Sequence, residues 1–75
     1  MYRVDKKIIA ANLRKLRGNR KIDVVAKALD ITPSALTNYE NAIRIPRDEV
    51  KAKIANYYGV TIESIFFNSN YNISW

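Results

Sequence analysis

The residues best suited to binding chemistry lie on one short polar face of a predicted helix. This helix is expected to run from Pro33 to about Asn41, with Leu36 and Tyr39 on its buried side. The opposite face carries small and amide side chains: Ser34, Ala35, Thr37 and Asn38. A solvated helix face is normally filled with Lys and Glu. This face therefore has the composition of a surface that lies against another molecule.

Basic side chains around this face indicate an anionic partner. The chain has 13 Lys and Arg against 7 Asp and Glu, and its pI of about 9.8 is typical of nucleic-acid-binding domains. Residues 1–27 hold nine basic and two acidic side chains, whereas residues 28–43 hold no Lys or Arg. The candidate phosphate contacts are Arg14, Lys15, Arg17, Arg20, Lys21, Lys27, Asn41, Arg44 and Arg47. A basic surface that only solvates the protein is the alternative.

The residue types that most catalytic sites need are missing. The chain has no His and no Cys, so the commonest metal ligand, the commonest general base and the thiolate nucleophile are absent. Asp48 and Glu49 suit the positive end of a helix dipole and do not indicate a catalytic pair. We expect no enzyme activity, metal, cofactor or small-molecule ligand. No segment resembles a membrane span or a signal peptide, so a cytoplasmic protein is expected.

The elements that position these residues are predicted to form one small all-α domain, a compact bundle of about five short helices. Apolar spacing predicts helices over residues 5–17 and 47–58, which end at Gly18 and Gly59, and a last short helix capped by Thr61. Residues 24–45 are predicted to form a helix, a tight turn and a second helix.

The turn and the start of the second helix follow from three side chains. Asp30 tolerates the left-handed conformation that a tight turn requires. Thr32 can cap the next helix, and Pro33 suits the first helical position because its missing N–H would have no partner there.

A wider set of positions carries a family resemblance. In the motif these are Ala26, Asp30, Ile31, Thr32, Ser34, Leu36, Thr37, Tyr39, Glu40 and Pro46; before it Ile9, Leu13, Arg14, Leu16 and Arg17; and after it Ile54, Ala55, Tyr58, Gly59, Val60 and Ile65. From about Ile9 to Phe67 the chain resembles phage repressors of the Cro and CI type, the XRE helix-turn-helix family. This resemblance implies a lambda-repressor-like DNA-binding domain over residues 1–67. It implies a sequence-specific transcriptional regulator of double-stranded DNA, most simply a repressor.

The resemblance also implies how DNA would be read. Residues 33–41 would enter the major groove, where the Asn38 amide can pair with adenine. The methyl groups of Thr37 and Ala35 can pack on thymine methyls, and Ser34 can donate or accept a hydrogen bond. A homodimer would bind a pseudo-palindromic operator.

Arg17 and Glu40 are expected, from the same resemblance, to form an ion pair that joins the first helix to the recognition helix. Unpaired, Glu40 would repel the DNA backbone. Two ordinary surface charges are the alternative.

Four positions depart from the family pattern. Ile22 and Pro33 stand where members often have Gln, and Asp30 and Ala42 stand where glycine is usual. A degenerate motif with a structural role is the alternative interpretation.

The tail, residues 68–75, has no charged side chain. Tyr71, Ile73 and Trp75 would lie on one side of an extended strand. An exposed apolar patch often marks an interface, so we expect the tail to fold back or to pair with a partner in a twofold dimer. An unstructured terminus is the alternative.

Two other functions stay open at this point. The apolar tail could serve a protein-binding module, an antitoxin-like partner for which DNA binding is secondary. A basic domain could also bind RNA, although aromatic side chains that are predicted to be buried cannot stack on single strands.

Overall fold

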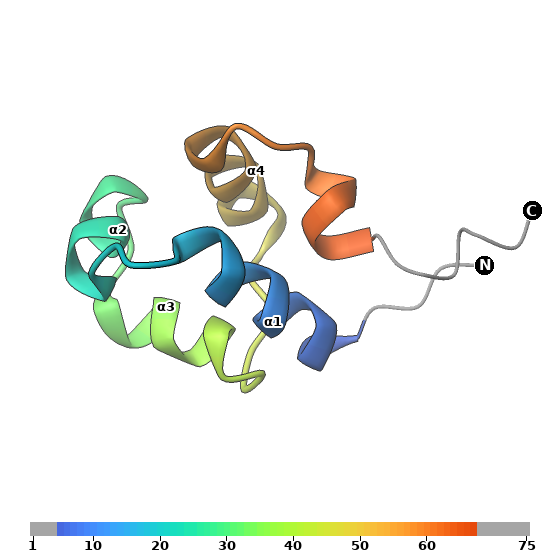
Figure 1. The fold of residues 1–75 in the computed structure, drawn as a ribbon, viewed down its shortest axis with the longest axis horizontal. Coiled ribbons are helices and arrows are strands. Elements are labelled where there is room, and N and C mark those ends of the chain that lie inside the picture. The colour runs from blue at the N-terminus through green and yellow to red at the C-terminus, as the bar shows by residue number, and fades with distance from the viewer. Residues whose placement is uncertain (1–4, 68–75) are drawn as a thin grey trace, which may run out of the picture.

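The computed structural model describes residues 5–67. Five helical elements follow one another along the chain: α1 (Lys6–Arg17), α2 (Ile22–Ala28), α3 (Pro33–Glu40), α4 (Asp48–Tyr58) and η1 (Glu63–Phe67) (Figure 1). The described part of the chain contains no strand. The predicted all-α bundle of about five short helices is therefore confirmed. The tail and its predicted dimer contacts lie outside the described residues.

The ends of the helices are set by local hydrogen bonds. Asp5 caps α1 by accepting from the backbone N–H of Lys7 at 2.8 Å, and Gly59 ends α4 in the left-handed conformation. Thr61 accepts from the backbone N–H of Ser64 at 3.2 Å, as a capping residue does. The element that follows, η1, is π-helical, whereas the sequence pattern predicted an ordinary short helix.

The core is formed by apolar side chains from all five elements. Twelve buried residues make up this cluster: Ile9, Leu13, Val25, Ala26, Leu29, Leu36, Tyr39, Val50, Ile54, Ala55, Ile65 and Phe66. They follow the three- and four-residue spacings expected of one helix face. Because every helix contributes two or three of them, no helix can move without opening the core.

The packing leaves one side of α3 at the surface. The inner side of α3 packs against α1 and α2, and η1 packs against α1. In Figure 1, α3 lies along the lower edge of the bundle and α4 along the upper edge. None of the helices among the described residues is long and apolar enough to cross a bilayer.

Two residues other than glycine within residues 5–67 have a positive φ, and both lie at ends of the motif helices. Asp30 has φ 59° in the turn between α2 and α3, and Ala42 has φ 62° just after α3. At the second turn, the backbone N–H of Ile43 donates to the carbonyl of Asn38 at 2.9 Å, which is a common way to close a helix. Alanine has no side-chain group that compensates for the left-handed conformation, so Ala42 is strained by about 1–2 kcal/mol.

Replacing this alanine by glycine is expected to stabilise the fold. Ala42→Gly should raise the free energy of unfolding by about 0.5–1 kcal/mol, because relief of strain exceeds the extra entropy of the unfolded chain. The matched control is Ala52→Gly, at an exposed site inside α4, which should lower it by about 1 kcal/mol. Urea unfolding measures both values, and a loss of stability in Ala42→Gly would contradict the strain at this turn.

Candidate nucleic-acid interface

The candidate reading helix, α3, starts and stops where its sequence dictates. The hydroxyl of Thr32 accepts from the backbone N–H of Ala35 at 3.0 Å, and Pro33 occupies the first turn. The helix ends at Glu40, with Asn41 as its C-cap. Eight residues are too few for a stable isolated helix, so α3 depends on its packing against the bundle.

The two faces of α3 differ as the apolar spacing predicted. Leu36 and Tyr39 are buried in the core, while Ser34 and Thr37 are exposed. Asn38 is half-buried, and its side chain makes no hydrogen bond within residues 5–67. Its amide is therefore available to a ligand that approaches α3 from solvent.

Ala35 is less accessible to a ligand than its predicted place on the polar face of the helix indicated. It is half-buried and packs against the core cluster. Its methyl group therefore contributes first to the attachment of α3, and only its exposed part can contact another molecule. Helical spacing places a residue on a face but does not tell how deeply a small side chain at the edge of that face is covered.

The far end of α3 is attached to α1 by an ion pair. Nε of Arg17 donates to both carboxylate oxygens of Glu40, at 2.8 and 3.1 Å. The side chain of Glu40 is only 4% exposed and that of Arg17 is 22% exposed. The hydrogen bond to Glu40 raises the pKa of Arg17 above its ordinary value, so this guanidinium stays charged. The pair expected from the resemblance is present, with its carboxylate buried and its guanidinium partly exposed.

A second arginine contacts the same end of α3. The Arg14 guanidinium donates to the backbone carbonyl of Glu40, which is one of the carbonyl groups that a helix end leaves without an intrahelical partner. A positive charge there also suits the negative end of the helix dipole. Arg14 and Arg17, one turn apart on α1, thus bind the carbonyl and the carboxylate of a single residue.

Arg20 also makes contacts inside the fold. Its guanidinium donates to the carbonyl of Leu16 at 2.9 Å and lies 5.7 Å from the ring centre of Tyr58 on α4. Its backbone carbonyl accepts from Arg17 at 2.7 Å. Three of the predicted phosphate contacts, Arg14, Arg17 and Arg20, therefore form a network that joins α1 to α3 and α4. The sequence pattern did not reveal that Arg14 contacts Glu40 or that Arg20 contacts Tyr58, because these partners lie far along the chain.

The remaining candidates for phosphate contacts stay available. They are exposed side chains without a hydrogen bond or ion pair among residues 5–67: Lys15, Lys21, Lys27, Asn41, Arg44 and Arg47. They lie on α1, at the two ends of α2, at the end of α3, in the loop that follows it and at the start of α4. Two exposed apolar side chains, Val24 and Ile43, lie on α2 and just after α3 and were not among the candidates. No group of Asp and Glu side chains in the described part of the chain could hold a metal ion.

Comparison with known families identifies the motif. Residues 11–65 match the model of the family HTH_3, described as helix-turn-helix. The chain belongs to this helix-turn-helix family. Membership confirms the resemblance to XRE-type proteins and supports a DNA-binding transcription regulator. No curated protein matches the sequence.

Solved structures share the helix-turn-helix fold. The SOS-response transcriptional repressor LexA from Eubacterium rectale superposes with a TM-score of 0.82 at 20% identity, over 95% of this chain and 78% of that one. Two structures of the clp gene regulator ClgR from Corynebacterium glutamicum give TM-scores of 0.73 and 0.69 at 18% and 19% identity. They cover 87% and 80% of this chain, and 71% and 80% of theirs. At these identities the likeness establishes the fold.

Removing the cation that pairs with the buried Glu40 carboxylate is expected to destabilise this helix-turn-helix domain. Arg17→Met leaves the Glu40 carboxylate buried without its partner and should lower the free energy of unfolding by about 3 kcal/mol. Glu40→Gln keeps a neutral acceptor and should cost less, about 1 kcal/mol. The matched control is Lys15→Met on the exposed side of α1. Equal stability of the Arg17 and Lys15 variants in denaturant unfolding would contradict the buried pair.

Tyr58 gives the domain a pH dependence at high pH. Its hydroxyl is buried and makes no hydrogen bond among residues 5–67. Burial, followed by the charge of Glu40, raises the pKa of Tyr58 above its ordinary value. The unfolded chain therefore releases this proton first, so the contribution to stability is complete below about pH 10 and is lost as the pH rises further.

Tyr58→Phe removes this dependence. Between about pH 9 and pH 11 the variant should lose less stability than the wild type, because phenylalanine has no proton to release. At neutral pH the variant should be as stable as the wild type or slightly more so, since a buried hydroxyl without a partner is removed. Tyr57→Phe, at the exposed neighbour, serves as the control. If thermal unfolding shows the same loss of stability with pH in both variants and in the wild type, Tyr58 does not cause the pH dependence.

Proposed function

We propose that this protein is a transcriptional repressor that binds a specific double-stranded DNA sequence by inserting residues 33–41 into the major groove. The observation that carries the proposal is the contrast between the two sides of α3. One side is fixed through Leu36, Tyr39 and the buried Glu40. The other presents small polar side chains and an amide without a protein partner. A rigid helix with such a face suits direct reading of base edges.

Asn38 is the principal base reader in this proposal. The NH₂ group of its amide donates to N7 of adenine, and its amide oxygen accepts from the N6 amino group. This is a bidentate contact in the major groove. Ser34 donates or accepts at a neighbouring base, and the methyl group of Thr37 packs on a thymine methyl. Ala35, being half-buried, adds only a small apolar contact. No Lys or Arg lies on α3 to bind guanine, so A·T pairs are favoured at the centre of each half-site.

Phosphate binding divides into two groups of side chains. The exposed, unpaired side chains named above supply the direct contacts to the DNA backbone. Their binding to phosphates releases the counterions whose loss drives association. Arg14, Arg17 and Arg20 already donate to protein groups. The main role of Arg14 and Arg17 is to position α3, and that of Arg20 is to join α1 to α4. The donors that remain free on each guanidinium can reach a phosphate in addition.

The active form in this proposal is a twofold homodimer. Residues 1–67 form the DNA-binding domain, and residues 68–75 supply Tyr71, Ile73 and Trp75 to the contact between copies. Two α3 helices about 34 Å apart would then bind the two halves of a pseudo-palindromic operator. Occupancy of that operator would block the access of polymerase.

Selection of bound duplexes from a random DNA pool tests the proposal at one fixed salt concentration. The wild type should enrich a palindromic motif. Asn38→Ala should lose preference at one symmetric position in each half-site, with a cost of about 1–3 kcal/mol per contact. Asn56→Ala, at an exposed site on α4, is the matched control and should enrich the wild-type motif.

Two outcomes would contradict the proposal. Salt-sensitive binding without any enriched motif would leave a protein-binding module as the better function. An unchanged motif with Asn38→Ala would remove Asn38 from base reading.

A further inference from the structure

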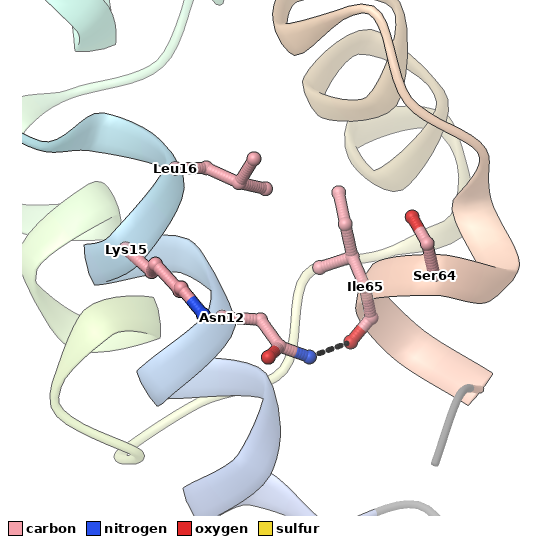
Figure 2. A pocket seen from close by; sticks show the side chains of 5 residues that line it. All are labelled: Asn12, Lys15, Leu16, Ser64 and Ile65. Atoms are coloured by element: carbon pink, nitrogen blue, oxygen red, sulfur yellow. Dashed lines mark hydrogen bonds between the residues drawn. The ribbon is translucent and has the colours of Figure 1, made fainter.

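A groove lies between the first and the last described helices. Three residues of α1 and two of η1 line it: Asn12, Lys15, Leu16, Ser64 and Ile65 (Figure 2). The Asn12 amide donates to the carbonyl of Ile65 at 3.0 Å and so ties η1 to α1 at one end of the groove. The groove has a volume of about 270 Å³ and mostly apolar walls. That is several times the roughly 30 Å³ of a water molecule, so a large side chain fits.

We propose that this groove receives the apolar side chains of residues 68–75 from a second copy of the chain. The proposal rests on the homodimer of the proposed function and assigns its contact surface. By the twofold symmetry, each copy donates its tail and accepts its partner's tail.

The composition of the tail fits such a groove. Residues 68–75 contain Tyr71, Ile73 and Trp75 and no charged side chain. Aromatic side chains contribute about 150–250 Å² of contact area each, which makes them strong anchors at interfaces. In the groove, Leu16 is partly buried and can contact such an anchor, whereas Ile65 belongs to the core and is only 1% exposed. Lys15 can place its charge over an aromatic ring.

The distribution of charge favours a meeting of copies at this end of the molecule. Each copy has a net charge of +6, so most of their surfaces repel one another. From Thr61 onward the chain carries a single charge, that of Glu63, and no Lys or Arg. A contact through η1 and the tail therefore brings two copies together where the repulsion is smallest.

The position and length of the tail allow the exchange. The described chain ends at Phe67, two residues after the groove residue Ile65. Eight further residues reach about 26 Å when extended. When the η1 elements of two copies face each other, each tail therefore starts beside its own groove and can reach that of the partner.

Trp75 is the only tryptophan of the chain and reports directly on docking. In the wild type, its emission should shift to shorter wavelength and resist quenching at concentrations where sedimentation shows a dimer. Dilution should reverse both changes together with dissociation. Ser64→Arg fills the groove with a charged side chain and should weaken the dimer at least about tenfold while exposing Trp75. Ala52→Arg adds the same charge on the exposed face of α4 and should change neither reading.

A mixing experiment separates exchange between copies from folding back within one chain. Ser64→Arg has a tail with tryptophan but a blocked groove, and Trp75→Ser has an open groove but no tryptophan. Adding the second variant to the first should restore the protected emission, because the intact groove accepts the tail of the other chain. Because the Ser64 hydroxyl donates to the carbonyl of Thr61 at 2.7 Å, circular dichroism of Ser64→Arg alone should first show the helix content of the wild type.

Three results would overturn the exchange. Protection of Trp75 that persists on dilution into monomer would show a tail folded onto its own chain. An exposed Trp75 in a wild-type dimer would show that the two copies meet at another surface. A wild type that stays monomeric would show that the tail forms no contact between copies. All these readings are made without DNA, so failure to select a DNA motif would leave them unaffected.

Discussion

The structure depends on a single buried carboxylate, that of Glu40 at the end of α3. A charge in a domain core is costly unless its partner and hydrogen bonds are close to ideal. Here Arg17 supplies the charge at 2.8 Å, and Arg14 binds the carbonyl of the same residue. Since α3 has only eight residues, these contacts and the two apolar anchors Leu36 and Tyr39 fix its position. Because the carboxylate is stable in the core only while it is paired with Arg17, this contact holds α3 in one orientation against α1.

That constraint divides the basic side chains into two groups. Arg14, Arg17 and Arg20 join the helices to one another, and the exposed lysines and arginines farther along stay free. Positive charge alone does not tell the two groups apart, because both contribute equally to the net charge of +6. The distinction matters for DNA binding: a side chain that is already hydrogen-bonded has fewer donors for phosphate, and its loss alters the shape of the reading surface as well as its charge.

Local features of the fold were predictable from the sequence, and long-range side-chain contacts were not. Thr32, Pro33 and Asp30 specify the turn of the motif through caps and dihedral preferences that involve only near neighbours. The pairing of Arg17 with Glu40 came from the family resemblance, since no spacing rule connects residues 23 positions apart. The contact of Arg20 with Tyr58, the half-burial of Ala35 and the π-helical form of η1 depend on how helices pack, which periodicity does not encode. The DNA contacts assigned to α3 stay predictions.

The proposed function depends on Asn38, held on this fixed helix, pairing with an adenine in the major groove. The most direct test replaces N7 of the selected adenine by carbon and compares the affinities of wild type and Asn38→Ala for the two duplexes. N7 faces only the major groove, so the change leaves base pairing and the minor groove intact. The wild type should lose about tenfold in affinity on the altered duplex, and Asn38→Ala should bind both duplexes equally. Equal binding of both duplexes by the wild type would contradict this pairing.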